Sequence, residues 1–440
     1  MRQQRRRPQL VAGLLLALAV LVGPSAVPSV AFVPSDGVRP GAVLAAADDA
    51  TAPLPDPAVL TALLKKVSRS GIGTVGLVVT TTDGTVLADR GADTPLTPAS
   101  TMKVLSTMTA LDALGADRTF ATRVLDSGSG RIVLVGGGDP LLTDKTSTST
   151  YKTASLQKLA KATAAALKAA GRTKVSLRYD ASLFSGPTWN PSWKSYWKGW
   201  EAKVAALEIN SGKISGGRAS ANPAKTAATA FAKRLRAAGI TVSSVASGTA
   251  VSGSAELARV TSTSLDRIIH RTLRQSDNVA AETLSRHAAI ASGRAGSFSG
   301  AAANVKAWLT ARGLWTSGLT LVDGSGLAPS NKLTATVLAS AVRIALAEDE
   351  FAPIVDGFPV AGESGTLKSR FDDPSEKAGR HVVHAKTGTL SGLAALAGYV
   401  TTADGATLVF AEIGNKSSSY YRVYNWLDRE AAVLARCGCR

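Results

Sequence analysis

A serine and a lysine three residues apart, Ser100 and Lys103, constrain this chain more than any other feature of its sequence. They begin a segment rich in helix formers, Val104 to Leu114, and Pro98 stands where a first helical turn usually begins. A helix places residues three apart side by side. Serine is a poor nucleophile until a base takes its proton, and a lysine held away from water has a lowered pKa that suits this task. Amphipathic helices also show this pattern by chance, so it needs support from other motifs.

Two later motifs supply this support. A Ser-Asp-Asn tripeptide begins at Ser276, 176 residues after Ser100, and a Lys-Thr-Gly tripeptide begins at Lys386, a further 110 residues along the chain. Each motif alone is weak evidence, but the three in this order are the set found in penicillin-binding proteins and class A β-lactamases.

The chain resembles the low-molecular-mass class C penicillin-binding proteins, which are D-alanyl-D-alanine carboxypeptidases and endopeptidases. The resemblance covers nearly everything after residue 50. Beyond the three motifs, it rests on the stretches Gly137–Pro140, Val322–Leu327, Phe358–Gly362, Gly365–Leu367, His384–Leu390 and Leu396–Val400. It implies a serine D,D-peptidase that works through an acyl-enzyme. The bond hydrolysed is the D-Ala-D-Ala bond of peptidoglycan stem peptides, and the cross-links between stem peptides are a second candidate substrate. It also implies acylation by β-lactam antibiotics such as penicillin.

The pattern of elements predicts an α+β fold. Three strand-like segments near the C-terminus, Val382 to Thr387, Leu393 to Val400 and Thr407 to Ile413, have helical segments before and after them. Such an order indicates an antiparallel sheet flanked by helices. The resemblance identifies this arrangement as the penicillin-binding protein/β-lactamase-like transpeptidase fold.

The long separation of the first two motifs predicts a domain inserted between them. In class A β-lactamases these motifs lie far closer together, whereas the resembling peptidases carry an insertion here. We expect residues 48–115 and 261–440 to form the catalytic penicillin-binding domain and residues 116–260 to form one inserted domain. Residues 1–47 are interpreted as a signal peptide and linker.

The resemblance implies a catalytic role for five residues. Ser100 attacks the carbonyl of the penultimate D-Ala, and Lys103 is the base for that step. Ser276 relays a proton to the leaving amine, and Lys386 tunes Ser276 electrostatically. Asn278 carries both donor and acceptor atoms, which suit the substrate amide and Lys103.

The strand that begins at Lys386 is expected to bind the substrate. The segment Lys386 to Thr389, with Gly388 inside it, would pair with the substrate backbone as an added strand. Lys386 and Thr387 would hold the terminal carboxylate by charge-assisted hydrogen bonds. Backbone N–H groups of Ser100 and Thr389 would form an oxyanion hole, in which one donor is worth roughly 2.7–4 kcal/mol.

The N-terminus is typical of an export signal. Four arginines within the first seven residues precede an apolar run of 13 residues, Leu10 to Val22, which is short for a membrane span. Cleavage could follow Ala31 or Ala47, and without cleavage the segment would be a weak membrane anchor. We therefore expect an exported protein, extracellular or periplasmic, associated with the cell wall or membrane.

The chain is strongly basic, with 50 Lys and Arg, 32 Asp and Glu, and a formal charge of +18. We interpret the positive charges as spread along the chain. No zinc-finger spacing, helix-turn-helix pattern or RNA-binding aromatic motif occurs. We therefore expect an anionic cell-envelope surface as a partner, and no nucleic acid.

No cofactor and no metal is expected. The four histidines, whose spacing fits neither H-E-x-x-H nor a nucleophile elbow, are His270, His287, His381 and His384. We expect them to have surface or structural roles. Cys437 and Cys439 are not a zinc ligand set by themselves. They could form a local disulfide, link two chains or belong to a dispensable tail.

Two other functions stay open. A β-lactamase or esterase of the same fold is disfavoured by the long insertion, and a non-catalytic wall-binding relative is disfavoured by the intact motifs. No E-x-x-L-N sequence follows Asn278, and class A β-lactamases need a glutamate-held water to clear penicillin. We expect Glu282 to point along the helix that follows the second motif. The expected behaviour is therefore slow clearance of penicillin with turnover of D-Ala-D-Ala peptides.

Overall fold

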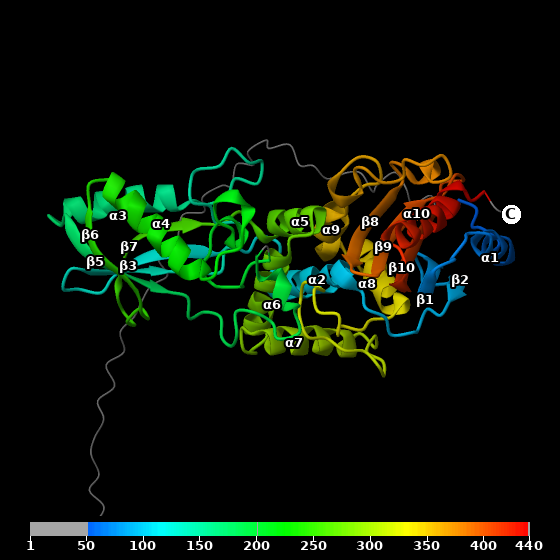
Figure 1. Cartoon of the computed structure of the whole chain (residues 1–440), viewed down its shortest axis with the longest axis horizontal. Helices are drawn as coiled ribbons and strands as arrows, with labels where there is room; N and C mark the ends of the chain where they lie inside the picture. The colour runs from blue at the N-terminus through cyan, green and yellow to red at the C-terminus, as the bar shows by residue number, and fades with distance from the viewer. Residues whose placement is uncertain (1–51, 200, 439–440) are drawn as a thin grey trace, which may run out of the picture. The chain divides into compact units, whose positions relative to one another are not determined.

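The computed structural model describes residues 52–199 and 201–438. These residues form two five-stranded sheets with their helices (Figure 1). The predicted signal peptide, its two candidate cleavage positions and Cys439 lie outside the described residues. Cys437 is buried and disulfide-bonded. Within the described ranges, no helix has both the length and the apolar character needed to cross a membrane.

The first sheet is antiparallel throughout and has the strand order β2-β1-β10-β9-β8. Its strands are β1 (Ile72–Thr81), β2 (Val86–Arg90), β8 (Val383–Leu390), β9 (Leu393–Thr401) and β10 (Thr407–Ser417). Early and late parts of the chain therefore share one sheet, with Val78 of β1 opposite Ala411 of β10. The strand that carries the third motif, β8, lies at an edge.

Helices cover both faces of this sheet. They are α1 (Pro57–Lys65), α2 (Met102–Leu114), α5 (Leu265–Gln275), α6 (Asn278–Ala291), α7 (Phe298–Ala311), α8 (Ala335–Ala347), α9 (Ala352–Gly357) and α10 (Tyr420–Arg436). Successive strand residues point to opposite faces. In β1, Leu77 and Val79 share a core with α1 and α10, whereas Val78 shares a core with α2 and α8.

Helix α2 is enclosed by protein along most of its length. Every residue from Met102 to Leu111 is buried, and α5, α6, α7 and α8 all pack against it. A helix that is buried all round has no solvent-facing side on which it could shift. The groups at its N-terminus are therefore held in fixed positions.

The second sheet is mixed and has the order β6-β5-β4-β3-β7. Its strands are β3 (Ala121–Asp126), β4 (Arg131–Val135), β5 (Lys174–Asp180), β6 (Thr241–Ser247) and β7 (Ala255–Thr261), and its helices are α3 (Leu156–Ala169) and α4 (Pro223–Ala237). Strands β4, β5 and β6 are parallel, which requires crossover connections. These connections contain α3 and α4, which lie side by side (Figure 1). Leu177 of β5 and Phe231 of α4 are buried in the core that the helices share with the sheet.

The predicted α+β fold is confirmed, with the antiparallel sheet formed by the three C-terminal strands and two early ones. All strands of the second sheet fall within residues 121–261.

Trp193 joins this part of the chain to the part after the second motif. Its ring nitrogen donates a 2.7 Å hydrogen bond to Asp323, and its ring contacts Phe298 edge-on at 5.3 Å between centroids.

The core of the first sheet supports a stability prediction. Phe410 of β10 is completely buried beside α10, so replacing it by alanine removes contacts and leaves a cavity. We expect Phe410→Ala to lower the free energy of unfolding by about 3–5 kcal/mol. Val86→Ala, at a side chain that is 55% exposed, should change it by less than about 0.5 kcal/mol. Urea unfolding of both variants measures the difference, and equal losses would contradict this account of the core.

Candidate active site

Ser100 lies in a short 3-10 turn, Ala99–Thr101, that leads directly into α2. Ala99 has a φ of 48°, a left-handed conformation that is uncommon for a residue with a side chain. Gly326 permits this turn, because a Cβ there would lie 1.9 Å from the Ala99 carbonyl oxygen. The half-buried Ser100 is thus presented beside the positive end of a buried helix.

Lys103 is completely buried one turn along the same helix. Its Nζ lies 2.8 Å from Ser100 Oγ, 2.7 Å from Asn278 Oδ1 and 2.7 Å from the Ser325 carbonyl oxygen. The structure thus brings together three of the residues predicted from the sequence. All three partners of this amine are uncharged groups.

Burial changes the protonation of Lys103. Loss of water around the side chain lowers the pKa of Lys103 to about 8. Four carboxylates, first Glu201 and then Asp323, Glu282 and Asp277, oppose this effect through their negative charge. The amine therefore loses its proton far more readily than an exposed lysine, whose pKa is about 10.4.

The second lysine, Lys386 on β8, is also completely buried. Its Nζ donates to Ser276 Oγ at 2.9 Å and to the Thr387 carbonyl oxygen at 2.7 Å. Burial, and then the positive charge of Lys103, lower the pKa of Lys386 well below its usual range. Ser276 ends α5 in a left-handed conformation with φ 56°, a strained backbone of the kind found at functional sites.

Strand β8 passes close to the nucleophile. A Cβ at Gly388 would lie 2.6 Å from the Pro98 carbonyl oxygen and 3.1 Å from the Ser100 nitrogen, so only glycine allows this approach. Thr387 Oγ1 contacts Thr366 Oγ1 at 2.7 Å, and Thr389 Oγ1 contacts the Tyr424 hydroxyl. Among the described strands, none pairs with the outer edge of β8 from Lys386 onward.

Glu282 has a position that the sequence reasoning did not anticipate. The expectation that it points along α6 is wrong, because its carboxylate is completely buried against the turn at Gly324 and Ser325. Its Oε1 accepts the backbone N–H groups of Gly324 at 3.0 Å and Ser325 at 2.8 Å. These bonds fix the turn whose carbonyl oxygen contacts Lys103. Burial, then the charge of Asp323, raises the pKa of Glu282 to about 7.

Glu201 is a second residue that sequence reasoning missed. It is 8% exposed, and its Oε2 accepts a 2.9 Å hydrogen bond from Asn278 Nδ2. Burial raises the pKa of Glu201, while the hydrogen bond from Asn278 and the positive charge of Lys103 act in the opposite direction. No motif marks Glu201, because its partner is 77 residues away in the sequence.

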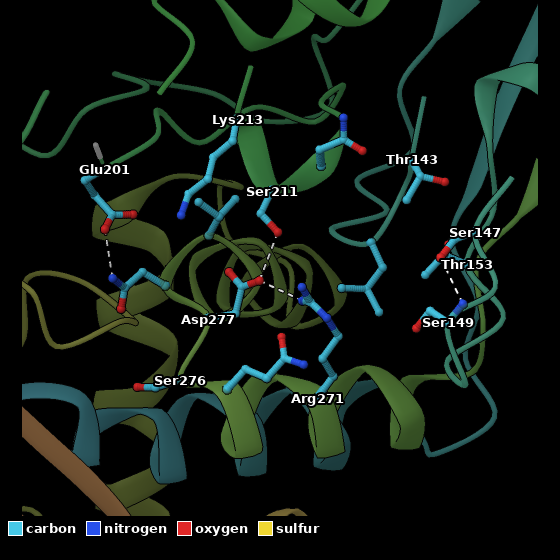
Figure 2. A pocket seen from close by; sticks show the side chains of 15 residues that line it. Thr143, Ser147, Ser149, Thr153, Glu201, Ser211, Lys213, Arg271, Ser276 and Asp277 are labelled. Atoms are coloured by element: carbon cyan, nitrogen blue, oxygen red, sulfur yellow. Dashed lines mark hydrogen bonds and ion pairs between the residues drawn. The ribbon is translucent and has the colours of Figure 1, made fainter. Parts of the chain in front are cut away.

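A cavity of about 470 Å³ opens beside the second motif. Its lining includes Ser276 and Asp277 of the second motif, together with Glu201, Ser211 and Lys213 from earlier in the chain (Figure 2). Figure 2 also shows Asp277 between Ser211 and Arg271, with bonds of 3.0 Å and 2.7 Å. Burial alone would raise the pKa of Asp277, but Arg271 and these hydrogen bonds hold it below its usual range.

The histidines stand apart from this chemistry. No described histidine bonds to Ser100, Lys103, Ser276 or Lys386. His287 is buried against Phe120, with 4.0 Å between ring centroids, and bonds to the Gly138 carbonyl group. Over residues 52–199 and 201–438, no group of three or more His, Cys, Asp or Glu side chains is placed to hold a metal ion.

Comparison with known families decides the classification. The sequence matches the D-Ala-D-Ala carboxypeptidase 3 (S13) family over residues 58–216 and 213–422. The chain belongs to this family. The resemblance stated from the three motifs is thereby confirmed.

The alignments of this S13 chain with curated relatives cover most of its length. Carboxypeptidase DacB of Mycolicibacterium smegmatis is 35% identical over 451 residues, which cover 98% of this chain and 96% of the relative. A carboxypeptidase of Mycobacterium tuberculosis is 36% identical over 406 residues, which cover 88% of this chain and 86% of the relative.

Solved structures show the same fold. Penicillin-binding protein 4 of Haemophilus influenzae has a TM-score of 0.71 at 22% identity, with 84% of this chain and 97% of that chain covered. Another structure of that protein, complexed with a β-lactam, has a TM-score of 0.65 at 22% identity and covers 86% and 98% of the two chains. The transpeptidase-like fold is therefore shown for this S13 chain.

The contact between β8 and the nucleophile turn supports a prediction. In Gly388→Ala the new methyl group would push β8 away from Ser100 and misalign the acylation site. We expect the rate constant of acylation by a fluorescent penicillin to fall by about a hundredfold or more, with the folded state retained by circular dichroism. Gly199→Ala is the control, because a Cβ there meets no atom within 4 Å. Unchanged acylation of the Gly388 variant would refute the proposed approach.

Proposed function

We propose that this S13 chain hydrolyses the D-Ala-D-Ala bond of peptidoglycan stem peptides through an acyl-enzyme on Ser100. The observation that carries the proposal is the bonding of the buried Lys103 amine. A neutral amine has two N–H donors and one lone pair. The carbonyl oxygens of Asn278 and Ser325, each 2.7 Å away, can accept both donors. The lone pair is then left for the Ser100 hydroxyl at 2.8 Å, which makes Lys103 the base for acylation.

The second lysine and serine suit the later proton transfer. As the tetrahedral intermediate collapses, the leaving D-Ala amine needs a proton, and we assign its delivery to Ser276. In its ammonium form Lys386, whose Nζ lies 2.9 Å from Ser276 Oγ, can replace the proton that Ser276 gives up. Because burial lowers the pKa of Lys386, its ammonium group gives up a proton more readily than that of an exposed lysine.

We assign substrate binding to the outer edge of β8. An extended peptide can add to this edge as a further strand, with Thr387, Gly388 and Thr389 alongside it and the terminal carboxylate near Lys386 and Thr387. The N–H groups of Ser100 and Thr389 would then serve as the oxyanion hole. The close approach of Gly388 to the Ser100 nitrogen supports this arrangement.

We also propose that β-lactams acylate Ser100 and are released slowly. Oε1 of Glu282 already accepts two backbone N–H groups, and its Oε2 is buried 3.5 Å from Arg286 Nη1. Glu282 therefore presents no accessible oxygen to the water on which glutamate-assisted deacylation depends. A penicilloyl group, unlike D-Ala, does not leave the site, so it keeps blocking the approach of water.

Product analysis and adduct mapping test the proposed function. The purified chain should release D-Ala from a synthetic peptide that ends in D-Ala-D-Ala, and fluorescent penicillin should label Ser100. Ser100→Ala and Lys103→Gln should lose both activities. Lys65→Gln should retain them, because this exposed lysine belongs to α1, which packs on the sheet face opposite α2.

Three results would contradict the proposal. They are labelling at another residue, persistent labelling of Ser100→Ala, and rapid turnover of penicillin with an adduct lifetime under about one second. The last result would favour a β-lactamase. Analysis of products from cross-linked muropeptides separates carboxypeptidase from endopeptidase action.

We further propose that residues 116–260 form the inserted domain and that it binds the anionic cell envelope. This segment carries 21 Lys and Arg but only eight Asp and Glu, a net +13 of the chain's +18. Basic residues are spread along the chain, but the net positive charge is concentrated in this segment because acidic residues are few there. The second sheet and its separate hydrophobic core support treating the segment as a domain.

The outer faces of α3 and α4 fit a linear anionic polymer better than a lipid surface. Neither helix contains an acidic residue. Their exposed basic residues, none of which forms an ion pair with a described residue, are Lys158, Lys161, Lys168, Lys225, Lys233 and Arg236. No large hydrophobic side chain is exposed on either helix, so neither has an anchor for insertion into a bilayer. Export of the chain, which this partner requires, is part of the same proposal.

Charge removal on these helices tests the proposed face. Replacing Lys158, Lys161, Lys225 and Lys233 by glutamine should weaken binding of long-chain polyphosphate. It should also reduce the slope of log K against log[salt] by about two to three. The control removes four exposed lysines elsewhere, Lys65, Lys66, Lys368 and Lys377. Equal losses in both variants, or stronger binding to phosphatidylglycerol vesicles than to polyphosphate, would contradict the proposal.

A further inference from the structure

We infer that Glu201, a residue of the inserted segment, orients the side-chain amide of Asn278 and thereby positions Lys103 for the activation of Ser100. This inference rests on the proposed function. It goes further because Glu201 lies outside all three sequence motifs. Glu201 acts through Asn278, so it is a positioning residue rather than a catalytic one.

The geometry links Glu201 to the nucleophile in three short steps. Glu201 Oε2 accepts from Asn278 Nδ2 at 2.9 Å, Asn278 Oδ1 contacts Lys103 Nζ at 2.7 Å, and Lys103 Nζ contacts Ser100 Oγ at 2.8 Å. Glu201, Lys103 and Asn278 all have restricted access to water. Solvent therefore competes weakly for these bonds.

The chemistry of the carboxylate decides which way the Asn278 amide points. An ionised carboxylate can only accept hydrogen bonds, whereas an amide has one accepting and one donating end. Glu201 must therefore face the NH₂ group of Asn278, which leaves the carbonyl oxygen facing Lys103. The opposite orientation would place oxygen against oxygen on one side and N–H against N–H on the other.

Glu201 also acts on Lys103 by its charge. Among the carboxylates that oppose the effect of burial on the pKa of Lys103, Glu201 has the largest influence, ahead of Asp323, Glu282 and Asp277. The charge of Lys103 in turn lowers the pKa of Lys386. Glu201 itself is influenced by Asp277 and Lys213 in addition to its two partners in the site. Removing the Glu201 charge therefore makes Lys103 easier to deprotonate.

Two substitutions separate orientation from charge. Glu201→Gln removes the charge but keeps an oxygen that can accept from Asn278, and Glu201→Ala removes both. The matched control is Glu208→Gln, because Glu208 is a buried carboxylate in the same segment with no hydrogen bond to Asn278. The measurement is the second-order rate constant for acylation of the full chain by fluorescent penicillin, followed from pH 6 to pH 10.

The inference predicts a distinct pH profile for each protein. The wild-type rate should rise with pH as Lys103 loses its proton, with a midpoint near the pKa of about 8. Both Glu201 variants should have midpoints lower by about half a pH unit or more. Glu201→Ala should also have a high-pH plateau about tenfold lower, because the Asn278 amide is released. Glu201→Gln should lose less of the plateau, and Glu208→Gln should match the wild type.

If both Glu201 variants keep the wild-type midpoint, the inference is overturned, whatever their rate constant at high pH. Loss of packing alone would slow the reaction without moving the midpoint. An equal shift in Glu208→Gln would overturn it too, because the effect would then belong to any buried carboxylate of this segment. If the wild-type chain is not acylated at Ser100, the proposed function fails first and the inference fails with it. If Ser100 is acylated normally and only the shift is missing, the inference fails alone.

Discussion

Two completely buried lysines with uncharged partners, Lys103 and Lys386, impose the constraint on which this site depends. Among the described residues neither forms an ion pair, and their partners are hydroxyl, amide and carbonyl oxygens. Keeping an ammonium group away from water is costly unless it is paired with an opposite charge. At Lys103, the site therefore favours the neutral amine at a pH at which an exposed lysine would keep its proton.

The fold keeps Lys103 and Lys386 away from water by holding α2 and β8 close together. Helix α2 is buried on all sides and fixes Ser100 and Lys103 at its beginning. Strand β8 carries Lys386 and comes close to the same turn because Gly388 has no side chain. Beneath the turn, Glu282 fixes the backbone that offers the Ser325 carbonyl oxygen to Lys103. Catalytic geometry thus depends on the packing of two distant parts of the chain.

The three motifs can be recognised in the sequence because the residues of each motif lie within three positions of one another. The α+β fold also followed from local patterns in the three C-terminal strands and their turns. Glu201 and Glu282 could not be found in this way, because each becomes important only through a backbone or amide group far away in sequence. The net charge of residues 116–260 was present in the sequence, but it emerges only when residues are counted between the first two motifs.

The pKa of Lys103 is the quantity that tests the account most directly. It can be measured in the full chain by NMR titration of lysines labelled at Cε and Nζ, with the Lys103 signal assigned from its absence in Lys103→Gln. The account predicts that Lys103 titrates near pH 8, while exposed lysines titrate near pH 10.4. A Lys103 that titrates with the exposed lysines would show that burial does not make this amine a base, and would contradict the central claim.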